Sequence, residues 1–515
     1  MLEADVAVVG SGVAGALVAW QLAAHGLRVL VLEGGPPINR RQAVERFRRA
    51  PHGGLDAPYP VEPVAVVGQF NRHYLQAGPD LFTGTYLRLL GGTTWHWLGT
   101  AMRLLPADFE LRSRYGVGVD WPFGYAELEE DYCRAERALG VAGQGDCGSP
   151  RSSPYPLPGL PATYLERKLA QVERYPIEVL PAARNSQPYE GRPECCASAT
   201  CVPICPNGAK YDATVHLELA ERAGARVLTH HQVVALESDA EGRVHRARTA
   251  PGVQVQARVF VLAAHAIETP RLLLTSGLAR GSGQVGRNLM GSLGQISWAL
   301  APEPVYPFRS PQVVSGITAF RDGPFRSHRA GFLTSIGNDG WPEPPTRRAE
   351  RLLEEGLRGK ALQQALRDHA SRQVLLVSNC EQLPDPDNRV TLGELVDVHG
   401  VPRPRIHYRV GAYTREGMDE AVLVHARLLD RWGATMVHHV EESTDPAHIL
   451  GTCRMGSEPG RSVVDSQLRC HEHSNLWIVS TAVFPTSGAC PPTLTLAALT
   501  FRACRSIERF LRQGS

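Results

Sequence analysis

At 515 residues, with 43% hydrophobic and 21% charged side chains, the chain has the composition of a globular protein with room for two or more domains or one elaborate one. A formal net charge of +2 gives no reason to expect nucleic acid as a partner. No apolar run reaches the roughly 18 residues that a membrane-spanning helix needs, and the N-terminus lacks the basic region of a signal peptide. We therefore expect no transmembrane segment of its own and export only when folded on a partner.

The first predicted element is a strand, a turn, a helix and a second strand within residues 4–35. Asp5 to Val9 is a β-branched run suited to a strand buried on both faces, and Ala14 to His25 has helical periodicity. Glu33, at the end of the second strand, is placed to accept hydrogen bonds from a ribose, which favours FAD or NAD over NADP. An ordinary glycine-rich turn is the alternative, and strand, helix and acid together disfavour it. The turn has the G-x-G-x-x-G spacing of a dinucleotide-binding fingerprint, with Gly10, Gly12 and Gly15.

The next stretch, Pro36 to Leu90, is polar and proline-rich, which predicts an extended excursion over the surface. The segment from Leu87 to Leu104 then contains GGTTWHW. Paired glycines let the backbone approach a flat ligand, and aromatic side chains can wall it. The candidate cofactor contacts in this segment are Gly91, Gly92, Thr93, Thr94 and His96.

Four cysteines fall close together in ECCASATCVPICPNGAKY. Four thiolates on one short loop can converge on one inorganic cluster. Zinc also accepts four thiolates, but usually from paired C-x2-4-C units, which this spacing fits poorly. Disulfides are the other alternative and would need an oxidising compartment. The candidate metal ligands are Cys195, Cys196, Cys201 and Cys205.

With the opening fingerprint, the GGTTWH segment resembles the glucose-methanol-choline (GMC) family of FAD oxidoreductases. The cysteine motif, together with DWPFGYAELEEDY and ARNSQPYEGRP, resembles one branch of that family, the large subunits of bacterial membrane-associated FAD dehydrogenases for glucose, fructose, gluconate and sorbitol. The resemblance implies an α/β fold with a Rossmann-type FAD-binding domain and an α+β substrate domain built on an antiparallel sheet. It also implies a 3Fe-4S iron-sulfur cluster held by three of the four cysteines, with Cys195 the member least firmly assigned.

The resemblance divides the chain into three parts. Residues 1–290 would form mainly the FAD-binding domain, with the cysteine-rich cluster loop near 191–211. Residues 291–445 would form mainly the substrate-binding domain, and 446–515 would return to the FAD-binding domain with the catalytic segment. The further cofactor contacts that it implies are Val234 near adenine, Ala264, Ala482 and Thr493.

Oxidation of an alcohol by flavin needs a base, because the carbon gives up hydride readily only as its oxygen loses a proton. The segment HILGTCRMG resembles the family's catalytic signature and implies that this base is His448. The resemblance also implies a covalent histidyl link from His96 to the flavin. The alternative is that His96 only packs near the ring.

Several positions depart from the family's pattern, among them His265, where relatives carry a small or amide residue, and Ser292, which replaces a histidine. Pro491 stands where relatives carry a histidine or asparagine that orients the hydroxyl, and proline offers neither a side-chain donor nor a backbone N–H. Ala447 stands where sugar-oxidising relatives tend to have a polar side chain, and Gly291 replaces an acid. We expect either that another group supplies the missing contact or that much of the ordinary sugar chemistry is lost.

The leading interpretation is an FAD-dependent dehydrogenase that oxidises a hydroxyl of a sugar, polyol or related cyclic alcohol. Electrons would pass through the iron-sulfur cluster to a cytochrome c or another acceptor. The alternatives are a tailoring oxidase of a non-sugar substrate and a non-catalytic flavoprotein for electron transfer. In the resembled branch a small chaperone-like subunit carries the large subunit across the membrane, which implies the periplasmic side of the inner membrane; without such a partner the chain would be cytoplasmic.

Overall fold

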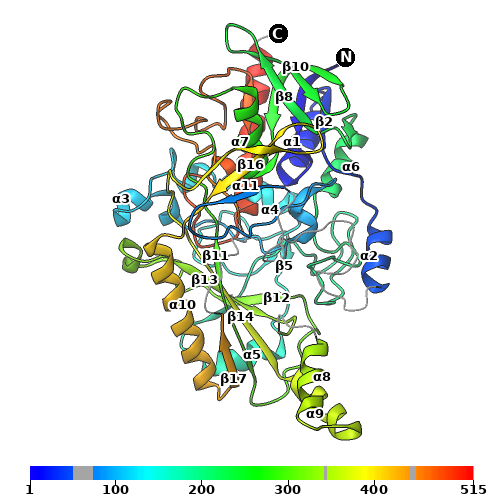
Figure 1. Ribbon diagram of the computed structural model, residues 1–515, viewed down its shortest axis with the longest axis vertical. Coiled ribbons are helices and arrows are strands. Elements are labelled where there is room, and N and C mark those ends of the chain that lie inside the picture. Colours follow the sequence, from blue (N-terminus) through cyan, green and yellow to red (C-terminus); the bar gives the residue numbers. More distant parts are fainter. Residues whose placement is uncertain (50–72, 342–344, 441–447, 514–515) are drawn as a thin grey trace.

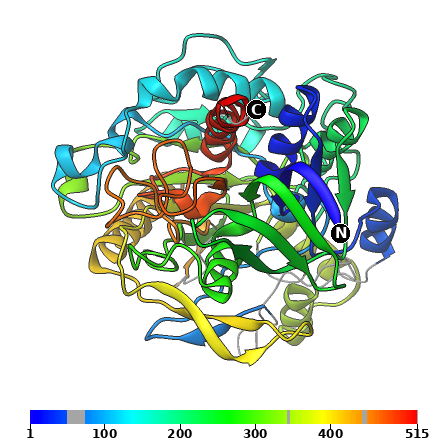
Figure 2. The same ribbon diagram turned by 90° about the horizontal axis from the view of Figure 1, so that it is seen from above.

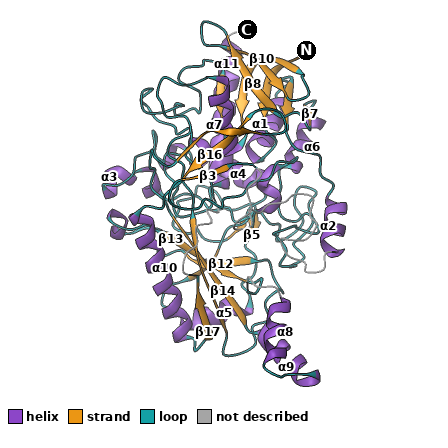
Figure 3. Cartoon of the chain, viewed as in Figure 1, coloured by secondary structure: helices purple, strands orange, loops and turns teal. Residues whose placement is uncertain are grey.

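The computed structural model of the chain describes residues 1–49, 73–341, 345–440 and 448–513. Two large sheets lie toward opposite ends of its long axis, and both chain termini lie at the end of the first sheet (Figure 1). Seen from above, the C-terminal helix lies beside the N-terminal strand and helix (Figure 2). Long irregular segments fill the region between the sheets (Figure 3).

The first sheet has a parallel core because its strands are covered on both faces and carry continuous apolar runs. Its order is β7-β2-β1-β10-β9-β8, with β18 also pairing with β10. Strand β1 pairs in parallel with both β2 and β10, whereas β8 and β9 form an antiparallel ribbon at one edge. The strands are β1 (Leu2–Val9), β2 (Val29–Leu32), β7 (Arg226–Leu228), β8 (Val233–Ser238), β9 (Val244–Thr249), β10 (Gln254–Leu262) and β18 (Leu476–Ile478).

Helix α1 follows β1 directly, as the fingerprint predicts, and its buried face is rich in alanine, which allows close packing on neighbouring elements. It packs against α6 and the C-terminal helix α11, while α7 packs against β8. The far ends of the sequence therefore share one dinucleotide-binding unit, which accords with the predicted Rossmann-type arrangement. These helices are α1 (Val13–Ala24), α6 (Thr214–Arg222), α7 (His265–Ser276) and α11 (Thr493–Gln513).

The second sheet is antiparallel throughout, in the order β17-β11-β14-β13-β12-β6. One face packs on α10 and α5 through an apolar core that includes Phe332, Leu376 and Val424. Its opposite face is turned toward the first sheet, as the site below shows. The elements are β6 (Ile177–Val179), β11 (Leu293–Leu300), β12 (Val313–Ile317), β13 (Phe332–Gly337), β14 (Gln373–Cys380), β17 (Thr435–His439), α5 (Tyr164–Val172) and α10 (Ala412–Arg431).

Helix α2 (Arg40–Arg49) corrects the prediction that residues 36–90 are only an extended excursion. Its residues Ala43 and Val44 are buried because they complete a small apolar cluster with side chains distant in sequence. Residues 50–72 of the same stretch lie outside the described part of the chain. The partners of the cluster are Leu87, Leu89, Trp95 and Ile204.

Smaller elements complete the fold. Strands β15, β16 and β3 form a three-stranded sheet, and β4 pairs with β5. None of the helices in the described residues is long and apolar enough to cross a membrane. These elements are β3 (Leu75–Ala77), β4 (Ala142–Gly143), β5 (Leu157–Pro158), β15 (Arg389–Val396), β16 (Pro402–His407), α3 (Leu111–Tyr115), α4 (Glu129–Leu139), α8 (Pro345–Glu354), α9 (Gly359–Ser371) and the short 3₁₀ helices η1 (Gly92–His96), η2 (Pro106–Phe109), η3 (Tyr125–Glu127), η4 (Pro324–Ser327) and η5 (Thr481–Val483).

Candidate active site

A cavity of about 490 Å³ lies at the carboxyl ends of four parallel strands of the first sheet. Ligands of open α/β sheets bind at this edge, outside the carboxyl ends of the strands. Residues from β13 and β14 of the second sheet also line the cavity, so both sheets contribute to one site. The strand ends that line it are Val9, Leu32, Ala263 and Val479.

The glycine turn forms one wall of this cavity. A Cβ at Gly12 would meet no other atom within 4 Å, so the space beside this residue is open to a ligand. Gly10, at φ 99°, and Gly15 are instead required by close packing, since a Cβ would collide with the carbonyl of Ala263 at Gly10 and with that of Gly10 at Gly15. Helix α1 begins at Val13 with no side-chain cap, which leaves its first amides available to an anion.

Glu33 lies immediately after β2 and lines the same cavity. Its carboxylate accepts hydrogen bonds from the backbone N–H of Ser11 at 3.1 Å and of Gly35 at 2.7 Å, and from the Ser11 hydroxyl. Burial raises the pKa of Glu33 above its ordinary value, and these hydrogen bonds oppose the shift. The carboxylate is therefore held in one orientation, as a ribose contact requires.

The GGTTWH segment also lines the cavity, beside the glycine turn, and includes the short helix η1. A Cβ on Gly92 would lie 3.3 Å from the Cα of Gly12, so the two glycine turns face each other closely. The N–H of Gly91 donates to the Ser11 hydroxyl at 3.1 Å, which ties the two turns together. His96 lines the cavity, and burial, aided by the charge of Lys210, lowers its pKa to about 4.

His448 lines the cavity together with Pro491. Burial lowers the pKa of His448 to about 4, so its imidazole is unprotonated at neutral pH and can accept a proton. Its Nδ1 is buried and has no hydrogen-bond partner among the residues that the structure describes. Ala447, the neighbouring departure from the family's pattern, lies outside those residues.

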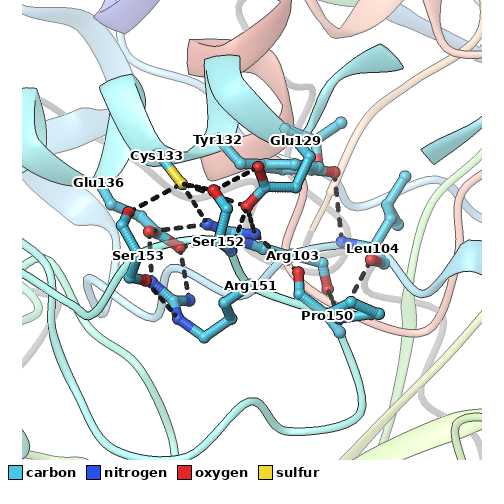
Figure 4. Close-up of polar contacts among 12 residues, drawn as sticks. Arg103, Leu104, Glu129, Tyr132, Cys133, Glu136, Pro150, Arg151, Ser152 and Ser153 are labelled. Carbon is cyan, nitrogen blue, oxygen red and sulfur yellow. Dashed lines mark hydrogen bonds and ion pairs between the residues drawn. The ribbon is translucent and has the colours of Figure 1, made fainter. Parts of the chain in front are cut away.

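The backbone of Arg103 forms a hydrogen bond with the loop that carries Pro491. The thiol of Cys490 donates to the Arg103 carbonyl over 3.6 Å. The Arg103 side chain lies in a buried network (Figure 4), where Nε and Nη2 bind the two carboxylate oxygens of Glu136 at 2.8 and 3.0 Å. Its Nη1 donates to Glu129 at 2.9 Å. Because these contacts restrain Arg103, we infer that they also restrain the loop above it.

Gly291 takes part in a second anchor of this loop. Its N–H donates to the side-chain oxygen of Gln382 at 2.8 Å, and the Tyr408 hydroxyl donates to the same atom at 2.8 Å. The N–H of Gln382 in turn donates to the Ser487 hydroxyl at 2.9 Å. Gly291 thus contributes a backbone contact that connects the segment before the second sheet to the loop that carries Pro491.

The structure brings most of the predicted catalytic and cofactor-binding residues into this one cavity; three of them, and the four loop cysteines, lie outside its lining. Gly15 packs α1 against the sheet, Gly91 supports η1, and Ala482 is buried in η5, where its carbonyl accepts the N–H of Cys453 at 2.7 Å. The predicted residues that line the cavity are Gly10, Gly12, Glu33, Gly92, Thr93, Thr94, His96, Val234, Ala264, Thr493 and His448.

Among the lining residues that were not predicted, Ser335, Val377 and Asn379 come from the second sheet. The sequence VLLVSNC predicts a strand but does not alternate strictly, so it does not reveal which face meets the cavity. The only available signal was the occurrence of polar residues within an otherwise apolar strand.

The four cysteines of the loop are all unpaired, which excludes the disulfide alternative within this structure. Cys201 and Cys205 are buried, Cys195 is partly buried and Cys196 is exposed. Burial raises the pKa of Cys195, and the charges of Cys201 and Cys205 act on it in the same direction, so these three thiols lie near one another. Cys196 is thus the most exposed of the four thiols, and the assignment of Cys195 as the least certain ligand stays a prediction. No group of three or more metal-ligating side chains is placed closely enough to hold a metal ion among the described residues.

Two buried cations lie beside these thiols. Lys210 donates to the carbonyls of Trp95, Trp97 and Cys201 at 2.9, 2.7 and 2.8 Å, and Nη1 of Arg184 lies 3.8 Å from the sulfur of Cys201. Burial lowers the pKa of Lys210 to about 8, while the thiols of Cys201 and Cys205 oppose the shift. Within the described residues neither cation forms an ion pair with a carboxylate, although the charge of Asp212 acts on Lys210 together with the two thiols.

Comparison with known proteins agrees with this architecture. A family model described as FAD dependent oxidoreductase matches residues 5–358, and one described as GMC oxidoreductase matches residues 384–500. The chain is 37% identical to the fructose dehydrogenase large subunit of Gluconobacter japonicus, across 100% of this chain and 99% of that protein. It is 31% identical to 6'''-hydroxyparomomycin C oxidase of Streptomyces lividus, across 98% and 92% of the two proteins. The crystal structure of pyridoxine 4-oxidase from Mesorbium loti has the same fold, with a TM-score of 0.65 and 19% identity over 98% of this chain and 99% of that one.

The parallel sheet, its glycine turn and the cavity at its edge define an FAD-dependent oxidoreductase, and the first family model agrees. The chain belongs to the GMC oxidoreductase family. The predicted family, fold class and FAD cofactor are therefore confirmed.

Proposed function

We propose that this protein is a dehydrogenase that oxidises a hydroxyl of a sugar, polyol or related cyclic alcohol. The observation that carries the proposal is that the unprotonated His448 lies in the same cavity as the glycine turn. The relative named as a fructose dehydrogenase subunit, matched over its whole length, supports the substrate class. The test is to mix the purified protein without oxygen with D-fructose, D-glucose, gluconate or sorbitol and to record the flavin absorbance. Bleaching by at least one of them supports the proposal, and none by any of them contradicts it.

The residues that line the cavity fit FAD. Gly12 leaves open space beside the N-terminus of α1 where a pyrophosphate would lie, and Glu33 presents an oriented carboxylate for a ribose. Val234 and Ala264 are proposed to border adenine, and Thr493 the pyrophosphate side of α11. When bound, FAD supplies an acceptor for the hydride that the carbinol carbon loses.

The protein's own contribution to the reaction is proton transfer at His448. The O–H bond of the substrate breaks and its proton passes to the unprotonated imidazole of His448 as a C=O bond forms, while the hydride of the C–H bond is the one that bound FAD would accept. His448 is buried in a cavity that residues of both sheets line, which limits the contact of its imidazole with bulk water. The positioning of the hydroxyl is considered in the next section.

Gly12→Ala is expected to abolish FAD binding without unfolding the protein. The new methyl group would touch no protein atom but would occupy the space proposed for the pyrophosphate. The matched control is Gly124→Ala, at another glycine whose Cβ would meet nothing within 4 Å and which is absent from the cavity lining. Flavin absorbance and circular dichroism of both purified variants give the answer. An alanine at position 12 that keeps its full flavin content would disprove the assignment.

His96 is proposed as the attachment point of the flavin. It lies at the end of η1 and lines the cavity, and its lowered pKa keeps the imidazole unprotonated, as a nucleophilic nitrogen requires. Acid precipitation tests the link. Flavin that stays with the protein pellet supports it, whereas flavin released into the supernatant shows that His96 only packs beside the ring.

The cysteine loop is proposed to hold an iron-sulfur cluster, with three of its four cysteines as ligands and Cys195 the least firmly assigned. The support is the pair of buried cations, Arg184 and Lys210, which lie beside these thiols without carboxylate partners. Two cations next to an anionic thiolate cluster stabilise its negative charge. Such a cluster, when bound, supplies one-electron transfer to an acceptor such as a cytochrome c.

Cys201→Ser is expected to remove iron and acid-labile sulfide while FAD stays bound. Cys470→Ser is the matched control, because Cys470 is another buried cysteine and lies outside the loop. Reduction of the flavin by a sugar should be unchanged in both variants, whereas electron transfer to cytochrome c should be slow only in Cys201→Ser. Zinc without iron in wild-type protein prepared without air would contradict the cluster.

A small chaperone-like subunit is proposed as a partner, with the periplasmic side of the inner membrane as the place of action. The support is that the relative from Gluconobacter japonicus is named as a large subunit.

A tailoring oxidase is the second candidate, favoured by Pro491 in the cavity and by the relative named as a hydroxyparomomycin oxidase. Reoxidation of the reduced flavin separates the two, since an oxidase returns its electrons to oxygen and a dehydrogenase to a dye or cytochrome.

A further inference from the structure

The antiparallel sheet presents two polar side chains to the cavity, Asn379 from β14 and Ser335 from β13. Successive residues of a strand point to opposite faces, so Val377 and Asn379 share one face. Ser335 lies directly opposite Val377 across the β13–β14 pair and therefore shares that face. The intervening Ser378 faces the other way, where its hydroxyl lies 2.8 Å from Nε2 of His425 on α10.

The side-chain amide of Asn379 has unused hydrogen-bonding capacity. It makes no hydrogen bond with any residue in the described part of the chain. Its register partner on β11 is Gly294, which has no side chain to fill the space on that side. An amide on a central strand that lines the cavity, with no hydrogen-bond partner among the described residues, is suited to donate to a ligand.

The backbone brings this wall toward His448. Met290, three residues before the start of β11, exchanges backbone hydrogen bonds of 3.0 Å with Leu450. Strand β11 then runs beside β14, so the segment of His448 and the wall that carries Asn379 are joined through one continuous piece of chain. Pro491 lines the same cavity and can donate no hydrogen bond.

We propose that Nδ2 of Asn379 donates a hydrogen bond to the substrate oxygen whose proton passes to His448, and so supplies the contact that Pro491 cannot make. Negative charge develops on this oxygen before the C=O bond is complete, and an amide donor stabilises it. Ser335, two residues along β13 from Leu333, the partner of Asn379, holds a second hydroxyl of the same substrate. The inference rests on the proposed oxidation of a hydroxyl and names the residues that position it.

The test compares Asn379→Leu, which removes the donor at nearly constant volume, with Ser335→Ala. Each protein is mixed without oxygen with the member of the sugar and polyol panel that reduces the wild type fastest. We expect the limiting rate of flavin reduction to fall roughly 10²- to 10³-fold in Asn379→Leu. In Ser335→Ala only the substrate concentration at half-saturation should rise, because a contact made equally in ground and transition states leaves the limiting rate unchanged.

Asn379→Asp provides a second variant of the same shape, without an N–H donor at neutral pH, in case leucine disturbs the fold. Flavin content and the thermal unfolding midpoint of both variants should match the wild type. A limiting rate within threefold of the wild type in a variant that holds FAD would overturn the role of Asn379, as would an equal loss in Ser335→Ala. If no panel member reduces the wild-type flavin, the proposed function itself fails and the inference with it.

Discussion

His448→Ala is expected to abolish flavin reduction by the sugar or polyol that reduces the wild type, with FAD still bound. A positioned base contributes roughly 10²- to 10⁴-fold to such a rate, because hydride leaves the carbon readily only as the oxygen loses its proton. His448 contributes a side chain to the cavity, and its removal leaves the glycine turn and the oriented Glu33 intact. Stopped-flow absorbance without oxygen measures the rate, and the flavin spectrum of the resting protein reports the cofactor.

Two further variants make this result specific. His399→Ala changes an exposed histidine in the turn after β15 and should leave the rate unchanged. His448→Asn keeps a polar side chain that cannot accept a proton and should be as slow as alanine. Bleaching at the wild-type rate in either His448 variant would refute the assignment of the base.

The pH dependence of the wild-type rate has a predicted sign. Burial lowers the pKa of His448 to about 4, so the imidazole is competent as a base above that pH and becomes protonated below it. The limiting rate of flavin reduction should therefore be lost as pH falls through about 4 and should lack an acid limb near the ordinary histidine pKa of about 6.5. If the loss of rate near pH 4 is absent from the low residual rate of His448→Asn, the titration belongs to His448.

The nucleotide-binding unit could be predicted from the sequence because its determinants are local. Gly10, Gly12 and Glu33 have fixed spacing relative to one strand and one helix, and a buried parallel strand reads as an unbroken apolar run. His448 could be placed only through a resemblance, because nothing in its local pattern distinguishes it from other histidines. Its position in the cavity depends on the return of the chain to the first sheet, from residues far beyond the fingerprint.

The part of the cavity lining that comes from the second sheet could not be predicted from the sequence, for a physical reason. Whether Asn379 faces the cavity or the core depends on the pairing of β14 with β11 and β13 and on which face α10 covers. Similarly, helix α2 gains its stability from side chains more than 35 residues away, such as Leu87 and Ile204, which local periodicity does not report. The exposure of Cys196 likewise depends on the folded loop and not on spacing.

Arg326→Met is expected to lower the free energy of unfolding by about 3–5 kcal/mol, because it leaves two buried carboxylates without a cation. The Arg326 side chain is fully buried, and its guanidinium binds Glu381 at 2.9 and 2.6 Å and Asp108 at 2.8 Å. Asp108 lies at η2 and Glu381 directly after β14, so this ion triad joins the two halves of the molecule. The Thr486 hydroxyl donates to the Asp108 carbonyl at 3.4 Å, which connects the triad to the loop that carries Pro491. Urea denaturation of the two proteins at pH 7 measures the difference.

The deficit of Arg326→Met should shrink as pH falls, and this distinguishes lost charge compensation from lost packing. Burial already raises the pKa of Asp108, and removal of the guanidinium raises it further, so the folded variant binds protons that the unfolded chain has released at the same pH. Protonation therefore restores stability to the variant as pH falls from 7 toward the ordinary aspartate pKa of about 3.8. Arg329→Met is the matched control, since Arg329 lies over the ring of Phe325 and forms no ion pair with a carboxylate in the described residues. A deficit that is constant with pH, or equal in the two variants, would mean that Arg326 acts through its volume alone.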